Sequence, residues 1–197
     1  MRKLTVDDIV DLRAYERERA EFRQHIIELK KTRRVTLGPI LTILFENTET
    51  MRWQVQEMAR AERMLRDEQI AHEVDTYNQL IPGAGELSGT LFLELTSDAA
   101  LREWLPKLVG IEFHVAFELP DGVMVYGRPS DADEKRLTRD DTTAAVHYLN
   151  FEFSPEQVAA FEKGPVHLIV DHPEYSYRAS LDAVQYASLV ADLLDLT

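Results

Sequence analysis

The sequence of 197 residues contains no cysteine. This absence excludes disulfides, zinc–thiolate sites, cysteine-ligated iron–sulfur clusters and a cysteine nucleophile, and it suits a reducing cytoplasm. No uninterrupted apolar run approaches the ~18 residues that would span a bilayer. The first residues, MRKLTVDDIV, turn acidic before the apolar core of a signal peptide could form. We therefore expect a cytoplasmic protein with no membrane partner.

Basic residues are scarce, with 22 Lys and Arg against 35 Asp and Glu, and the formal net charge is -13. The charge is uneven, because residues 1–70 carry 14 basic and 13 acidic residues, whereas residues 71–197 carry 8 and 22. An acidic surface repels nucleic acid, which binds proteins through cationic contacts. The one basic cluster, Lys30, Lys31, Arg33 and Arg34, is typical of a solvated helix end. We expect no nucleic-acid partner.

Neither glycine nor proline interrupts residues 47–65, NTETMRWQVQEMARAERML, which we interpret as the helix around which the chain is organised. Asn47 or Thr48 can cap this helix, and Glu49 places a negative charge in its first turn. With about 3.6 residues per turn, an apolar stripe forms on one side, and Glu62 lies near its middle. The stripe consists of Met51, Val55, Met58, Ala59 and Leu65. The opposite side carries Trp53, Glu57, Arg60 and Met64.

The rest of the chain divides into segments with helical periodicity and segments with strand alternation. Helices are predicted at 4–31, either continuous or broken near Leu12, and at 67–80, 97–108, 154–164 and 180–194. Ser154 and Gln157 form a capping box at the start of the helix 154–164. Strands are predicted at 35–37, 40–45, 87–95, 111–119, 123–127, 145–153, 166–170 and 175–179. The polar stretch 128–142 predicts a mobile loop.

Gly38-Pro39 predicts either a bend in one strand or a tight hairpin turn, and Pro120-Asp121-Gly122 predicts a turn that joins two strands into a hairpin. Hairpin pairing favours a mainly antiparallel sheet, with N-terminal helices, a central helix and a C-terminal helix. The sequence therefore predicts an α+β fold. We expect a single domain, 1–197, with a sub-boundary at 82–86 between a helical N-terminal part and a β-rich C-terminal part.

Five segments together resemble an uncharacterised bacterial family, the domain of unknown function 3501. They are KKTRRVTLGP, LFEN, RWQVQEMARAER, TYNQLIPGAGEL and HPEY. Genes of this family often lie beside genes for a rubrerythrin-like protein and an Fe–S oxidoreductase, so the resemblance implies an accessory role in redox or peroxide metabolism. It implies no activity or cofactor. The recurrent polar positions of the family map onto Arg33, Arg34, Glu46, Gln56, Glu57, Arg60, Glu62 and Asn78.

Glu62 would be costly to bury as a charge on an apolar stripe unless a cation paired with it. Arg33 or Arg34, at the end of the preceding helix, could supply that cation. The pair is either a structural ion pair or part of a site for an anionic ligand. In the second case Arg33, Arg34, Glu46, Gln56, Arg60 and Asn78 would bind the ligand. Glu57 or Glu62 would then act as the acid or base.

Trp53 lies beside Arg60 and Glu57 on the second face of the central helix. Together with Met64 it could form a patch for a homodimer or a partner protein. A tryptophan in such a position more often packs beneath a neighbouring element.

Three histidines fall in predicted strands, but their faces differ. His147 lies on the apolar side of its strand, whereas His114 lies on the polar side with Glu112. One metal ion cannot therefore collect His114, His147 and His167 together. Weak metal candidates remain, namely Glu112, His114, His167, Asp171 and His172. The sequence contains no HxxxH or ExxH pair on a helix and no phosphate-binding loop, so we expect no metal and no cofactor.

The sequence thus favours an accessory binding protein, a homodimer or the partner of a redox protein, with Arg33, Arg34 and residues 56–62 as its functional surface. The alternative is an enzyme or sensor that binds a small anionic ligand through the same arginines.

Overall fold

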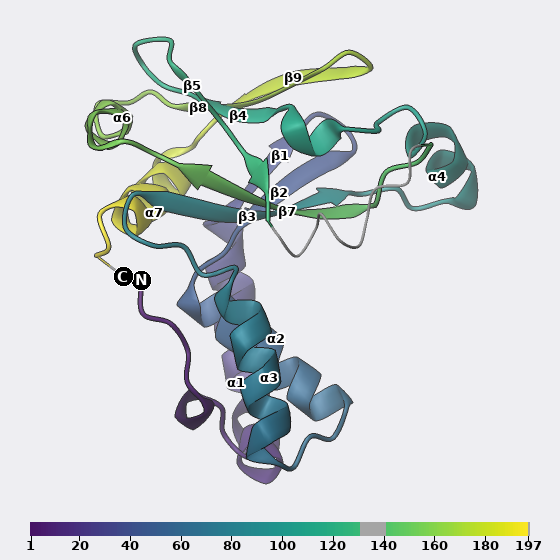
Figure 1. The fold of residues 1–197 in the computed structure, drawn as a ribbon, viewed down its shortest axis with the longest axis vertical. Helices are drawn as coiled ribbons and strands as arrows, with labels where there is room; N and C mark the ends of the chain where they lie inside the picture. Colours follow the sequence, from purple (N-terminus) through teal and green to yellow (C-terminus); the bar gives the residue numbers. More distant parts are fainter. Residues whose placement is uncertain (131–140, 197) are drawn as a thin grey trace.

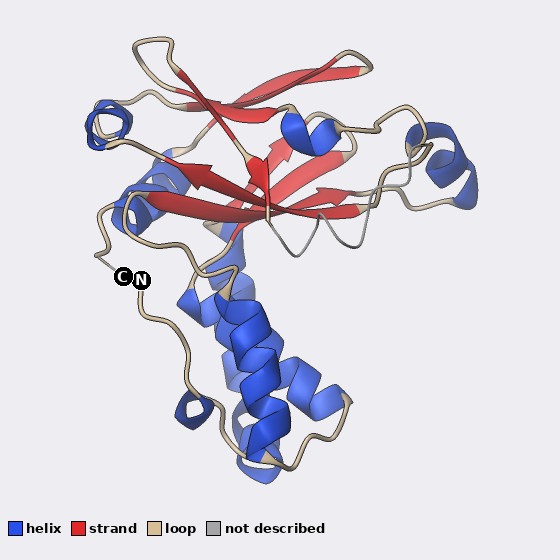
Figure 2. Cartoon of the chain, in the orientation of Figure 1, coloured by secondary structure: helices blue, strands red, loops and turns tan. Residues whose placement is uncertain are grey.

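The computed structural model describes residues 1–130 and 141–196 of the chain. Figure 1 shows two layers of antiparallel sheet, one above the other, and an arm of three helices that projects from the lower layer. Figure 2 shows that all strands lie in the two layers, that the arm is helical and that further short helices lie beside the sheets. The fold is α+β, as predicted. Among the described residues, no helix is long and apolar enough to cross a membrane.

The first sheet has the strand order β1-β2-β3-β7-β6, and the second has the order β5-β4-β8-β9. The strands of the first sheet are β1 (Arg34–Leu37), β2 (Leu41–Phe45), β3 (Glu86–Leu93), β6 (Arg128–Pro129) and β7 (Val146–Glu152). Those of the second are β4 (Val115–Glu118), β5 (Met124–Tyr126), β8 (His167–His172) and β9 (Tyr175–Ser180). Every neighbouring pair is antiparallel, as hairpin turns require.

The main core lies between the two sheets, where the apolar sides of alternating strands meet. Phe117 of β4 is at its centre. Its ring centroid lies 5.0 Å from that of Phe151 and 5.4 Å from that of Phe45, both in the first sheet. Tyr175 also joins the sheets, because its hydroxyl donates to the carbonyl oxygen of Leu37 at 2.6 Å. A Cβ at Gly38 would lie 2.6 Å from the same hydroxyl, so the predicted turn there needs glycine.

The arm consists of α1 (Leu12–Lys31), α2 (Thr48–Ala61) and α3 (Asp67–Asn78), which enclose a second core. The central helix begins as predicted, because Asn47 and Thr50 form a capping box. The first predicted helix is interrupted. A 3-10 turn, η1 (Val6–Asp8), comes first, and α1 begins after Asp11, whose carboxylate accepts from two backbone amides.

The shorter helices flank the sheets. They are α4 (Asp98–Trp104), α6 (Pro155–Phe161) and α7 (Ala183–Leu193). The capping box that the sequence predicted at Ser154 and Gln157 is present. The predicted loop 128–142 lies largely outside the described residues, and its first two residues form β6.

One strand prediction is wrong at its beginning. Residues 111–113 form a 3-10 turn, η2 (Ile111–Phe113), and the strand starts only at Val115. Gly110 precedes η2 with a φ of 87°, and the turn rotates Phe113 away from the core. Phe113 is therefore 60% exposed, although alternation placed it inside.

The predicted sub-boundary at 82–86 lies in the segment between α3 and the start of β3. β1 and β2 precede it in the chain, but β2 pairs with β3 from Leu41 to Phe45 in the same sheet. The chain termini also meet, since the amino group of Met1 lies 2.5 Å from the carboxylate of Asp195 (Figure 1).

We expect the fragment 86–197 to aggregate or remain unfolded. Without β1 and β2, the β3 edge has no partner, and an unpaired apolar edge invites intermolecular pairing. Near-ultraviolet circular dichroism and gel filtration of the fragment, beside the full chain, test this. A monomeric fragment with a cooperative thermal transition would contradict it and support two separate domains.

Candidate functional site

The predicted environment of Glu62 is wrong. α2 ends at Ala61, Glu62 caps it, and the Glu62 side chain is exposed. Arg63 then takes a left-handed φ of 53°, and the Met64 amide donates to the carbonyl of Ala59 at 2.9 Å. Met64 thus folds under the end of the helix with 8% exposure, whereas Leu65 points outward at 79%. Glu62 pairs with neither Arg33 nor Arg34.

Arg33 is 1% exposed and bonds entirely to protein groups. Its Nε donates to the carbonyl of Phe45 at 2.8 Å, and one terminal nitrogen donates to the carbonyl of Glu46 at 3.1 Å. The guanidinium also forms an ion pair with the buried carboxylate of Asp192 and donates to the hydroxyl of Ser188, both in α7. Arg33 therefore connects the end of α1 with β2 and α7.

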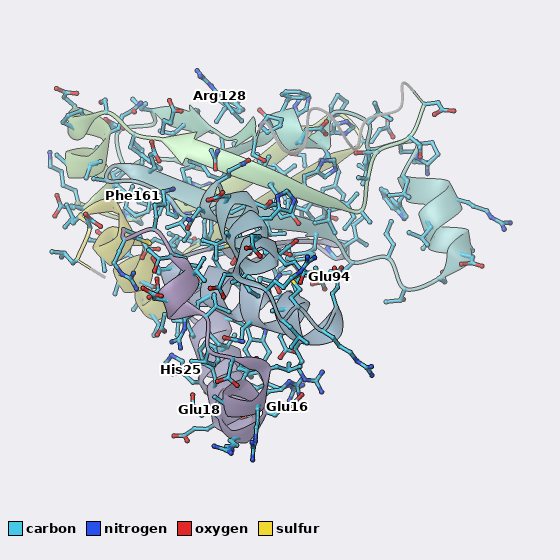
Figure 3. The ribbon with its side chains drawn as sticks, turned by 60° about the horizontal axis from the view of Figure 1, so that its bottom comes forward. Glu16, Glu18, His25, Glu94, Arg128 and Phe161 are labelled. Carbon is cyan, nitrogen blue, oxygen red and sulfur yellow. The ribbon has the colours of Figure 1, made fainter. Side chains whose placement is uncertain are left out.

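Arg34 points elsewhere. Its guanidinium lies on the exposed side of the first sheet, 2.9 Å from Glu94 and 5.6 Å from the centroid of the Phe92 ring. Figure 3 labels Glu94 on this side of the molecule. The two arginines diverge, so they do not form the convergent clamp for an anion that we predicted.

Glu46 is buried where β2 passes into α2. Its Oε1 accepts from the Thr90 hydroxyl at 2.5 Å. Within the described residues its Oε2 and the Ser88 hydroxyl have no hydrogen-bond partner. Burial lowers the pKa of Lys30, and the negative charge of Glu46 offsets part of that effect. The second carboxylate at this junction, that of Asp192, is held by Arg33, so the two carboxylates do not form a free acid–base pair.

Gln56 and Asn78 hold the N-terminal segment against the arm. The Gln56 amide accepts from the backbone N–H of Val10 at 3.1 Å and donates to its carbonyl at 2.9 Å. Asn78 forms the same two bonds with Leu4, at 2.8 and 2.9 Å. A side-chain amide can satisfy both backbone groups of one residue in this way. Both side chains are therefore structural.

Glu57 and Arg60 join α2 to α1. Arg19 donates to both oxygens of Glu57 at 2.8 Å, and the Tyr15 hydroxyl donates to Glu57 Oε1 at 2.6 Å. The Arg19 hydrogen bonds lower the pKa of Glu57, and burial raises the pKa of Tyr15. Arg60 donates to Glu16 at 2.6 Å, near the far end of the arm in Figure 3. A carboxylate held this way is a poor general base.

Trp53 packs against α1, as a tryptophan on a second helix face usually does. Its ring centroid lies 5.4 Å from that of Phe22 and 6.3 Å from that of Tyr15. Because Met64 is buried and Trp53 is half-buried against α1, these two side chains do not form the exposed partner patch that we predicted.

The histidines separate as their faces predicted. His147 is buried and bonds to Thr143 and Ala144, while His167 bonds to Ser180 at the opposite sheet. His172 is also buried, and both of its ring nitrogens are engaged by backbone groups. Among residues 1–130 and 141–196, no group of three or more His, Asp or Glu side chains could hold a metal ion.

The surface that pattern reasoning missed is the outer face of the second sheet. By register, one side of these strands faces away from the core, and the residues on that side include Ala116, Glu118, Met124, Tyr126, His167, Ile169, Asp171 and Arg178. A groove of about 460 Å³ is lined by part of this side, including Glu118, Met124, Ile169, Asp171 and Arg178. The alternation of Glu112, His114, Ala116 and Glu118 signalled a solvent-facing side, but no sequence pattern showed that helices would leave it open.

On this face, His114, Tyr126 and Asp171 are connected by hydrogen bonds. His114 Nδ1 lies 3.1 Å from Asp171 Oδ1, and the Tyr126 hydroxyl donates to Asp171 Oδ2 at 2.8 Å. Farther along the face, Arg178 donates to Glu118 at 2.7 Å. Glu112, named with His114 as a weak metal candidate, is buried in the η2 turn, so its predicted place on the solvent-facing side is wrong.

The comparisons with known proteins agree with this fold. The family model described as "Protein of unknown function (DUF3501)" matches residues 3–193. Among solved structures, a novel protein of unknown function from Burkholderia pseudomallei is similar, with a TM-score of 0.89 and 35% sequence identity. The match covers 98% of this chain and 100% of that chain. The comparison with curated proteins finds no match.

We expect Arg33→Met to lower the free energy of unfolding by ~3–5 kcal/mol, because it leaves the Asp192 carboxylate buried without its guanidinium. Arg33→Met combined with Asp192→Leu should recover much of the loss, since the remaining site is apolar. Arg34→Met is the matched control and should cost at most about 1 kcal/mol. Urea unfolding measures all three. Equal effects at positions 33 and 34 would contradict the structural role of Arg33.

The Glu57 interaction should make stability depend on pH. Because the pKa of Glu57 is lowered in the folded state, its contribution is complete above the unfolded pKa, near ~4.3, and is lost as pH falls through the folded value. We expect Glu57→Gln to reduce stability at pH 6 by about 1 kcal/mol and to flatten the loss below pH ~4. Urea unfolding between pH 6 and 3 measures both effects. Glu18→Gln, an exposed change on α1, should follow the wild type.

Proposed function

Because the chain belongs to the DUF3501 family of proteins of unknown function, we propose, as our own hypothesis, that it is a non-catalytic binding protein. The proposal places a partner protein on the outer face of the second sheet. The partner would belong to redox or peroxide metabolism, as the gene neighbours of the resembling family suggest. One observation carries the proposal: an antiparallel sheet presents aromatic and apolar side chains to solvent along a groove.

The composition of this face supports protein binding. Tyr126 is 44% exposed, Phe113 precedes His114 at the edge of the face, and Met124 and Ile169 line the groove. Tyrosine, phenylalanine, methionine and arginine are the side chains enriched in protein interfaces. In Figure 1 no described helix lies above the second sheet, whereas the first sheet is joined to the arm below.

The fixed polar pairs favour binding over catalysis. His114, Asp171 and Tyr126 are locked together, and Arg178 is locked to Glu118. Groups held in place before association lose little side-chain entropy when a partner covers them. They can therefore supply oriented hydrogen bonds at the rim of the groove.

Charge indicates the kind of partner. The strands of the second sheet and their tight turns carry Glu118, Asp121, Asp171 and Glu174 against one basic residue, Arg178. A second copy of the same face would be repelled, whereas a partner with a basic face would be attracted and steered. We therefore expect the partner protein to have a basic docking face.

We expect Phe113→Ser and Tyr126→Ala each to weaken binding of the native partner by at least ~10-fold, because exposed aromatic residues in interfaces often contribute more than 1 kcal/mol. The partner is first isolated on immobilised wild-type protein at moderate salt and identified by mass spectrometry. Calorimetry with the purified partner then compares the variants.

The matched control is Val184→Ser, which removes an exposed apolar side chain from α7, away from the second sheet. It should bind the partner as the wild type does. A partner that binds all four proteins equally would refute the docking face. A partner with no redox cofactor would refute the pathway but leave the face intact.

A further inference from the structure

The tip of the helical arm carries an exposed apolar side chain beside a small cavity. Leu65 lies in the loop between α2 and α3 and is the most exposed large hydrophobic residue of the described chain, at 79%. Its position is fixed from both sides, because Met64 is packed beneath the end of α2 and α3 begins two residues later. Single solvent-exposed leucines are common, so the exposure of Leu65 is informative only together with the neighbouring cavity.

The cavity has a volume of about 160 Å³ and is lined by the N-terminal segment, the end of α2 and the start of α3. Val6, Ile9 and Ile70 form apolar walls, and Leu65 itself stands at the rim. Most small-molecule sites need roughly 300–1,000 Å³, so this cavity is too small for a typical ligand. A cavity of about 150 Å³ holds a benzene ring, so a single leucine side chain fits.

The charges around the tip are arranged in complementary pairs. Asp67 lies at the cavity, whereas Arg63 and Arg66 flank Leu65. Among the described residues, the side chains of Arg63 and Asp67 make no hydrogen bond or ion pair, and the Arg66 side chain donates to Gln69 at 3.4 Å. Positively charged side chains beside the exposed Leu65 and a negatively charged side chain at the cavity therefore lie within one small patch.

We propose that the occupant of this cavity is Leu65 of a second copy of the chain. A two-fold dimer requires a patch that complements itself, with residue i of one copy against residue j of the other and the reverse. The tip meets this requirement: each Leu65 enters the other copy's cavity, and each Arg66 faces the other copy's Asp67. Residues 1–70 carry nearly balanced charge, so two arms can approach without the repulsion of the acidic sheets.

The proposed dimer uses the tip of the arm and a second copy of the chain, whereas the proposed function uses the second sheet and a different protein. The tip lies at the end of the arm farthest from the second sheet (Figure 1). Its small area implies a contact below the ~1,200 Å² of standard stable interfaces, so the dimer is weak.

We expect sedimentation velocity of the wild type between about 1 and 300 μM to show a concentration-dependent monomer–dimer equilibrium, with a dissociation constant on the order of 10 μM. Leu65→Asp should remain monomeric throughout. Leu196→Ser, a change at an exposed leucine near the C-terminus, is the matched control and should dimerise normally.

Exchanging the charges at positions 66 and 67 tests whether these residues form the dimer contact. Arg66→Asp alone and Asp67→Arg alone should each dimerise at least ~10-fold more weakly, because like charges then meet twice in each dimer. An equimolar mixture of the two variants should form a heterodimer as tight as the wild type. Circular dichroism establishes that each variant is folded.

A wild type that stays monomeric at 300 μM, or a dimer that survives Leu65→Asp, would overturn the inference. So would a mixture of the charge variants that fails to associate. Phe113→Ser should leave this dimer unchanged, and Leu65→Asp should leave partner binding unchanged, so the failure of either proposal can be recognised separately.

Discussion

The structure depends on one buried cation. A guanidinium can leave water only where carboxylate and carbonyl oxygens replace its hydration. Arg33 finds these oxygens at the last residue of β2, at the residue that follows it and in α7. The carbonyls of Phe45 and Glu46 mark the point where β2 ends and the arm begins. Asp192 brings the last helix to the same point. The junction between arm and sheets is thereby set by a residue that pattern reasoning had assigned to ligand binding.

The other polar positions that we predicted to bind a ligand have related structural roles. Gln56 and Asn78 satisfy backbone groups of an N-terminal segment that has little regular structure of its own. Glu57 and Arg60 join α2 to α1 through ion pairs. Buried or half-buried polar groups that are satisfied in this way specify a geometry, and they are not free to bind a ligand. For this reason a partner has to bind at exposed surfaces rather than at the polar network of the arm.

The sequence alone predicted those structural features that depend on local interactions. Residues close in the chain determine the helix caps at Asn47 and Ser154 and the turn at Gly38. They also determine which strand faces carry His147 and His114. The end of α2 could not be predicted, because Arg63 takes a left-handed conformation that no glycine announces. Nor could the partner of Arg33, since Asp192 is 159 residues away and only the assembled fold brings the two together. Periodicity likewise could not distinguish the 3-10 turn of η2 from the start of a strand.

The uneven charge of the chain gives the two proposed surfaces different partners. The outer face of the second sheet belongs to the acidic residues 71–197, where repulsion between copies disfavours self-association. The tip of the arm belongs to residues 1–70, where charges of both signs balance and self-complementary contact costs little electrostatic energy. Because the arm separates these regions in space, two copies joined at their tips would keep their acidic sheets far apart. Each sheet would then remain open to a basic partner, so dimerisation would present two docking faces without covering either.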